Sequence, residues 1–256
     1  PNSVTEIGYG AFYNCRGLTN INIPNSVTTI GHHVFSWCMG LTSVNIPNSV
    51  TNMGGAVFSE CSGLTSVTIS NNITAIYGST FQNCTSLTSV TIPDGVTSIG
   101  EGAFNHCTSL KSITIPESVT TIEKEAFYYC TSLTDIDIPD GITTIEKNTF
   151  SDCTNLPSVN IPDSVTEIKS GAFSGCATLT KIRIPDSVKS IGYSAFHGCT
   201  NLESINIPDG ITKIDSKLFC QCTNLKNIDI PSTVKSIGFG AFVECRSLTS
   251  IIIPNS

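Results

Sequence analysis

One pattern of 23 residues repeats along this chain from end to end, without an insertion or a deletion. It occurs eleven times and is clearest at residues 93–115, which we number as coil 5. A cysteine lies at the same place in every copy, three residues after a phenylalanine. These cysteines are Cys15, Cys38, Cys61, Cys84, Cys107, Cys130, Cys153, Cys176, Cys199, Cys222 and Cys245. A fixed period of this length is typical of a solenoid, in which each copy forms one coil stacked on its neighbours.

The first half of each copy predicts a turn followed by an extended piece. In coil 5 the turn is Pro-Asp-Gly at 93–95, a sequence that favours tight turns because proline fixes φ and glycine permits positive φ. Val96 and Ile99 follow, and we expect both side chains to be buried. Only Ser70 interrupts the series of prolines that open the copies.

The second half predicts a short helical segment and then a strand. Residues 101–107 carry apolar side chains at i, i+1 and i+4, which would turn one face of about one helical turn inward. Ile113 and Ile115 alternate with exposed residues at the period of two that a strand requires.

Together these patterns predict an α/β solenoid with a single domain over residues 1–256. Eleven parallel strands at ~4.8 Å spacing would form a sheet roughly 50 Å long. The phenylalanine segment is bulkier than a strand, so we expect the sheet on the concave side of an arc and the short strand and helical-turn segments on its convex side. The structural ladder of coil 5 consists of Phe104, Cys107, Leu110, Ile113 and Ile115.

Charge and hydropathy exclude two classes of partner. The net charge is −7, and no basic stripe exists that could neutralise phosphates, which argues against nucleic acid. No apolar run approaches the ~20 residues that span a bilayer, so this segment predicts no membrane span.

Both ends of the chain look like cuts through a longer array. The chain opens at Pro1 without a methionine and closes on Pro254-Asn255-Ser256, a repetition of its first three residues. Solenoid ends normally carry polar caps over the last core layer, and neither end shows one. We therefore expect a fragment whose anchor and sorting signals lie outside it.

Residues 110–130 read Leu-x-x-Ile-x-Ile-Pro-x-x-Val-x-x-Ile-x-x-x-Ala-Phe-x-x-Cys. Over the whole chain this pattern resembles the leucine-rich repeat of BspA-like surface proteins, the treponemal/BspA subtype with 23-residue repeats. Glu123 stands where that repeat has a glycine, and the asparagine ladder of ordinary leucine-rich repeats is missing. The resemblance implies a right-handed horseshoe or arc, a place on the cell surface or in the secreted fraction, and a role in adhesion.

The twelve cysteines do not predict disulfides. Ladder cysteines project from equivalent points, so their side chains run parallel, whereas a disulfide needs Cβ atoms that face each other. We expect buried, free and inert thiols that fill the core as small apolar groups. Cys220 alone lies off the ladder, and we expect it to be the surface or half-buried thiol that an alkylating reagent modifies first. His197 is its counterpart one coil earlier, but the four ligands of a structural metal site are not assembled.

The exposed positions of the Ile-x-Ile strand hold the candidate ligand-binding residues. Coils 1–4 present only threonine, serine and asparagine there. The charged residues that follow are Lys111, Asp135, Asp137, Lys181, Arg183, Glu203, Lys226 and Asp229. Asp135 and Asp137 lie two coils, ~10 Å, from Lys181 and Arg183, which suggests a docking patch with two opposite charges. The alternative is ordinary solvated surface.

No catalytic residue, metal ion or cofactor is predicted. The repeat offers no nucleophile with a base and an orienting group, and no glycine-rich phosphate loop. Asp135 and Asp137 alone fall short of the six to eight oxygen ligands that calcium takes. A file of threonines from Thr5 to Thr166 resembles the regular faces of ice-binding solenoids, although threonine is also ordinary at exposed strand positions.

The sequence thus favours a non-enzymatic module for protein–protein interaction or adhesion, which presents an extended concave sheet. Host or neighbouring-cell surface and matrix proteins are the expected partners. A structural spacer or rod without a ligand of its own is the alternative, and ice binding is a remote third.

Overall fold

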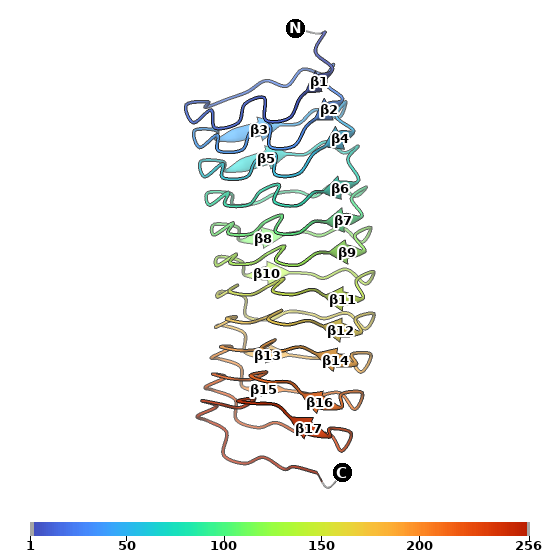
Figure 1. The fold of residues 1–256 in the computed structure, drawn as a ribbon, viewed down its shortest axis with the longest axis vertical. Coiled ribbons are helices and arrows are strands. Elements are labelled where there is room, and N and C mark those ends of the chain that lie inside the picture. Colours follow the sequence, from blue (N-terminus) through green and yellow to red (C-terminus); the bar gives the residue numbers. More distant parts are fainter. Residues whose placement is uncertain (1–2, 255–256) are drawn as a thin grey trace.

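A computed structural model describes residues 3–254 and shows an elongated stack of coils with the two chain ends at opposite ends of the stack (Figure 1). The repeated Pro-Asn-Ser of the two termini lies partly outside these residues. The described chain consists of short parallel strands joined by turns, a parallel β-solenoid with no helix in this range. It accordingly contains no helix that could cross a membrane.

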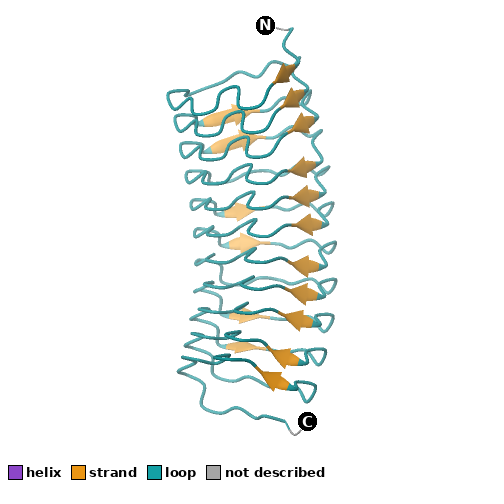
Figure 2. Ribbon diagram, viewed as in Figure 1, coloured by secondary structure: helices purple, strands orange, loops and turns teal. Residues whose placement is uncertain are grey.

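Two columns of strands run along the stack, as Figure 2 shows. One ladder holds β1 (Glu6–Ile7), β2 (Thr29–Ile30), β4 (Asn52–Met53), β6 (Ala75–Ile76), β7 (Ser98–Ile99), β9 (Thr121–Ile122), β11 (Thr144–Ile145), β12 (Glu167–Ile168), β14 (Ser190–Ile191), β16 (Lys213–Ile214) and β17 (Ser236–Ile237). Its strands pair as four short sheets, β1–β2–β4, β6–β7–β9, β11–β12–β14 and β16–β17. The other holds β3 (Ser43–Asn45), β5 (Ser66–Thr68), β8 (Ser112–Ile113), β10 (Asp135–Ile136), β13 (Lys181–Ile182) and β15 (Ser204–Ile205). Each paired residue faces its equivalent in the neighbouring coil, so the repeat sets the register.

The second ladder is less continuous than the sequence predicts. Only the pairs β3–β5, β8–β10 and β13–β15 form, and single bridges such as Asp137 to Asn160 and Asn160 to Arg183 join the coils between them. Within residues 3–254, coils 1, 4, 7, 10 and 11 contribute no strand to this ladder, and of these coil 7 carries Pro157, which has no N–H to donate.

The predicted helical turn at residues 101–107 is wrong, and with it the α/β class. Ala103, Asn105 and Cys107 donate N–H bonds of 3.0–3.2 Å three residues back, which makes a chain of tight turns. Gly102 and His106 have φ of 60° and 59°, a left-handed conformation that interrupts a right-handed helix. The alternate N–H groups of Gly102, Phe104 and His106 donate to carbonyls of coil 6 at 2.8–3.1 Å. Hydrogen bonds between coils therefore replace those of a helix.

We call this part of each coil the turn segment. Its eleven copies are residues 8–15, 31–38, 54–61, 77–84, 100–107, 123–130, 146–153, 169–176, 192–199, 215–222 and 238–245. Every copy contains two residues with positive φ, at the third and seventh positions. The turn segment is thus a third line of contact between coils, in addition to the two strand ladders.

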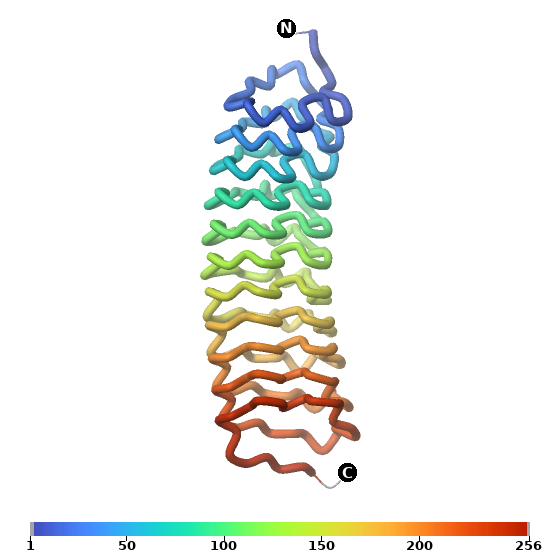
Figure 3. The backbone as a smooth tube through the Cα atoms, turned by 60° about the vertical axis from the view of Figure 1, so that its left-hand side comes forward, coloured from blue at the N-terminus to red at the C-terminus, as the bar shows by residue number. Residues whose placement is uncertain are grey.

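The predicted core ladder is confirmed. Phe104, Cys107, Leu110, Ile113 and Ile115 are all buried in one continuous core. Figure 3 shows the backbone of the stacked coils that enclose it. Phenylalanine rings of neighbouring coils stack nearly parallel, with centroids 5.3–5.9 Å apart. Each coil therefore depends on its two neighbours to bury its rings.

Candidate interaction surfaces

The strand face is the surface formed by the exposed residues of the second ladder. Each coil supplies three residues to it, as Lys111, Ser112 and Thr114 do in coil 5. All eight charged residues predicted from the sequence are exposed there: Lys111, Asp135, Asp137, Lys181, Arg183, Glu203, Lys226 and Asp229. In coils 1–4 this face presents only neutral hydroxyl and amide side chains.

The structure pairs some of these charges. Lys226 binds Glu203 at 3.0 Å, and Arg183 binds Asp163 of the preceding turn at 3.1 Å. Asp137 and Arg183 lie in one column with Asn160 between them, as the sequence predicts for residues two coils apart. Within residues 3–254, no ion pair involves Lys111, Asp135 or Lys181, so these charges face solvent.

The turn segment carries a feature that our sequence reasoning missed. All six tyrosines, the single tryptophan and all four histidines lie on it. Of the tyrosines, Tyr9, Tyr13, Tyr77, Tyr129 and Tyr193 are exposed. We call this surface the aromatic edge. The sequence carries the signal for this surface, because aromatic residues outside the phenylalanine ladder avoid the other 15 positions of the repeat.

Cys220 is not the surface thiol that the sequence suggested. It is buried, with 7% of its surface exposed. The position after the ladder phenylalanine lies between neighbouring coils, and small residues there, namely Ser36, Ser59, Asn105 and Ser151, are buried as well. Cys15, in coil 1, is instead the exposed cysteine of the described chain.

The ladder cysteines are free thiols, buried from Cys38 to Cys222, as predicted. They are more than small apolar groups, because each ladder thiol from Cys38 to Cys245 donates an S–H hydrogen bond to the phenylalanine carbonyl of the preceding coil. In coil 5, Cys107 Sγ lies 3.1 Å from the carbonyl oxygen of Phe81. Burial raises the pKa of the Cys61 thiol to about 12 and that of Cys107 well above its usual value, so these groups stay protonated and unreactive.

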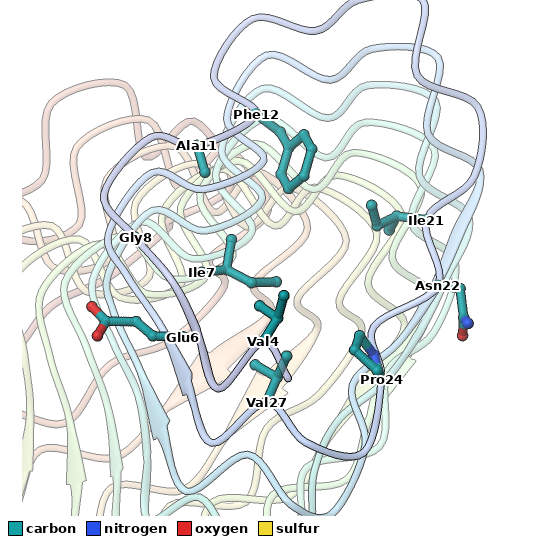
Figure 4. A pocket seen from close by; sticks show the side chains of 10 residues that line it. All are labelled: Val4, Glu6, Ile7, Gly8, Ala11, Phe12, Ile21, Asn22, Pro24 and Val27. Carbon is teal, nitrogen blue, oxygen red and sulfur yellow. The ribbon is translucent and has the colours of Figure 1, made fainter. Parts of the chain in front are cut away.

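A hollow of about 420 Å³ opens at the end of the stack near β1 (Figure 4). Val4, Ile7, Phe12 and Ile21 point into it, whereas Glu6 points away. These apolar residues occupy ladder positions that neighbouring coils cover elsewhere in the stack. The hollow is therefore the cross-section of the core rather than a site shaped for a ligand.

Several side-chain hydroxyls of the threonine file form hydrogen bonds within the protein. Thr28, Thr97 and Thr166 donate their side-chain hydroxyls to the carbonyl of the threonine one coil earlier, at 3.2 Å. Among residues 3–254, no group of three or more histidine, cysteine, aspartate or glutamate side chains is arranged to hold a metal ion.

Comparison with known proteins gives consistent results. The family model described as BspA type Leucine rich repeat region matches in six copies, over residues 1–94, 74–199 and 155–256. A leucine rich cell surface protein from Faecalibacterium prausnitzii A2-165 is similar at 36% identity and a TM-score of 0.67, covering 100% of this chain and 78% of that one. A leucine-rich repeat protein from Bacteroides ovatus is similar at 28% identity and a TM-score of 0.53, covering 88% of this chain and 82% of that one. The search of curated proteins found no match.

Proposed function

Because the chain belongs to the BspA-type leucine-rich repeat family, we propose that residues 1–256 act as one non-enzymatic domain, on the cell surface or secreted, that binds another protein in adhesion. The expected partners are host or neighbouring-cell surface and matrix proteins. The similar protein from Faecalibacterium prausnitzii is itself described as a cell surface protein, which supports this location.

The observation that carries the proposal is the distribution of charge on the strand face. Asp135 and Asp137 lie in coil 6 and Lys181 and Arg183 in coil 8, all exposed on one surface. A partner whose charges lie in the complementary order would associate faster with this patch and would be held there in one register. We propose this face, which we expect on the concave side of the arc, as the docking surface, with Lys111, Glu203, Lys226 and Asp229 at its margins.

The test is charge reversal. The double variant Lys181→Glu/Arg183→Glu should weaken binding to immobilised host matrix proteins or to intact cells at least tenfold at physiological salt. Its matched control is Lys189→Glu/Lys235→Glu, which makes the same change in net charge at exposed positions beside the other strand ladder. Equal binding by both variants and the parent would overturn docking at this face, and no saturable binding by the folded parent would overturn adhesion.

A structural spacer is the second candidate, and one observation favours it. The strand face of coils 1–4 is uniform and neutral, as a rod that only sets distance would be. A spacer predicts that the charge-reversed variants perform as well as the parent, whereas deleting whole coils changes function in proportion to length.

A further inference from the structure

The aromatic edge contains a hollow of about 630 Å³ that spans coils 6 to 9. Tyr128 of coil 6 and Tyr193 of coil 9 lie at its two ends. Between them the lining consists of Lys147, Asn148 and Ser151 of coil 7 and of Ser170, Gly171 and Ser174 of coil 8. The two tyrosines are three coil spacings apart, a distance of ~14 Å along the stack at ~4.8 Å per coil.

The hollow exists because small residues of coils 7 and 8 lie at positions where coil 6 or coil 9 carries tyrosine. Tyr128 is succeeded one and two coils later by Ser151 and Ser174, and Tyr193 is preceded one coil earlier by Ser170. Gly171 has φ of +67°, and a Cβ at this position would collide with the side-chain oxygen of Asn148. The floor therefore has both small side chains and one position that is held to glycine.

Polar side chains around the hollow are uncommitted. In the described part of the chain, the hydroxyls of Ser170, Ser174 and Ser194 form no hydrogen bonds with protein groups. The same holds for the side-chain amide of Asn148 and the side-chain ammonium of Lys147. Ser118 and Ser187, in the proline turns that open coils 6 and 9, instead donate their hydroxyls to a carbonyl of the preceding coil at 2.6 and 2.7 Å. The free groups converge on one concave surface, where a ligand could satisfy them.

These features together select a class of ligand. Tyrosine rings offer flat apolar faces with a polar tip, while hydroxyl, amide and ammonium groups offer donors and acceptors between them. A sugar ring has the matching chemistry, because it presents C–H groups on its faces and hydroxyls around its rim. The lining includes one ammonium group and no carboxylate, so a neutral sugar or one with a single acidic group fits. We propose that this hollow binds a linear oligosaccharide of a few rings that lies along the stack from Tyr128 to Tyr193.

This site goes beyond the protein docking proposed above and lies on another surface, so each can fail without the other. The test uses the whole chain and linear tetrasaccharides of β-1,4-linked glucose, N-acetylglucosamine and mannose, observed by saturation-transfer NMR and titration calorimetry. Extended uncharged and acidic peptides of similar length form the comparison set. At least one tetrasaccharide should bind saturably, and the peptides should not.

Variants locate the site. Tyr193 is 46% exposed, so Tyr193→Ala should weaken binding at least tenfold without lowering the unfolding temperature. Ser174→Phe should fill the hollow and abolish binding. Tyr77→Ala is the matched control, because Tyr77 is 49% exposed on the same edge outside this hollow, and its binding should equal that of the parent. Failure of all three tetrasaccharides to bind, tighter binding of a peptide at this hollow, or equal effects of Tyr193→Ala and Tyr77→Ala would each overturn the proposal.

Discussion

The strand face and the aromatic edge both repeat every 23 residues, but different groups form the hydrogen bonds between neighbouring coils at each. On the strand face, threonine side chains join the stacking, as when Thr65 and Thr134 donate hydroxyls to carbonyls one coil earlier at 2.9 and 3.2 Å. On the turn segment, main-chain N–H groups and buried thiols connect the coils. The turn segment also carries the exposed tyrosines, and its His32 accepts a hydrogen bond from the Gly55 N–H of the next coil at 2.9 Å.

Alkaline pH should have the largest effect on the turn-segment side of this comparison. Burial raises the pKa of the eight thiols from Cys61 to Cys222 above the ordinary value of 9.0. The unfolded chain releases these protons near pH 9 while the folded chain keeps them, so stability is full below pH 9 and falls above it. At about 1.4 kcal/mol per thiol and pH unit, the loss at pH 10 is roughly 10 kcal/mol. Urea unfolding under reducing conditions at pH 7.5 and 10 measures it, and equal midpoints would contradict it.

Removing one ring of the phenylalanine ladder comes next. Phe104 lies between Phe81 and Phe127, with centroids 5.3 and 5.4 Å away, and is fully buried. Phe104→Ala should cost ~3–5 kcal/mol through lost burial and a cavity. Chemical unfolding checks this, with Phe239→Ala as the control, since Phe239 is 81% exposed and its loss should change little.

Two substitutions at equivalent positions of the turn segment, one that removes a glycine and one that introduces it, test the role of the left-handed backbone. Gly171→Ala should destabilise by ~1–2 kcal/mol, because the left-handed conformation strains any residue with a Cβ and Asn148 is in the way. Glu125 has φ of 60° at the equivalent position of coil 6, so Glu125→Gly should be neutral or stabilise by up to ~1 kcal/mol. Unfolding temperatures that move in the same direction for both variants would argue against backbone strain as the cause.

The smallest effect is expected on the strand face. Lys226→Ala removes an exposed ion pair with Glu203 and should cost only ~0.2–1 kcal/mol, and less in high salt. The same unfolding measurement with and without added salt tests this. A larger loss would mean that the strand face contributes to stacking through its charges as well as its threonines.

Side-chain burial could be predicted from the sequence, and backbone conformation only in part. The period places Phe104, Cys107 and Ile113 inside, and all three are buried. The turn segment defeats the same reasoning, because spacing at i, i+1 and i+4 fits a helical turn as well as a series of tight turns. The left-handed φ of Gly102 and His106 and the N–H bonds to coil 6 separate the two, and the spacing within one coil reveals neither.

For a similar reason, the sequence predicted the exposed charges of the strand face but missed the burial of Cys220 and the hollow. Exposure of Asp135 and Lys181 follows from alternation in a strand, so the structure places both as expected. The burial of Cys220 does not follow from alternation, since it depends on how closely neighbouring coils approach at that position. The hollow between Tyr128 and Tyr193 likewise needs residues 65 positions apart to be viewed together, which only the stacking makes evident.

The thiol bonds have a consequence for how such a protein changes length. Cys107 reaches back 26 residues to Phe81, and Cys130 reaches back 26 residues to Phe104, so each bond joins one coil to the next and no farther. Excising one 23-residue unit from the interior, or duplicating it, would bring together surfaces already complementary to each other. The aromatic edge could then be lengthened in steps of a single coil, with each new coil packed by the same contacts as its neighbours.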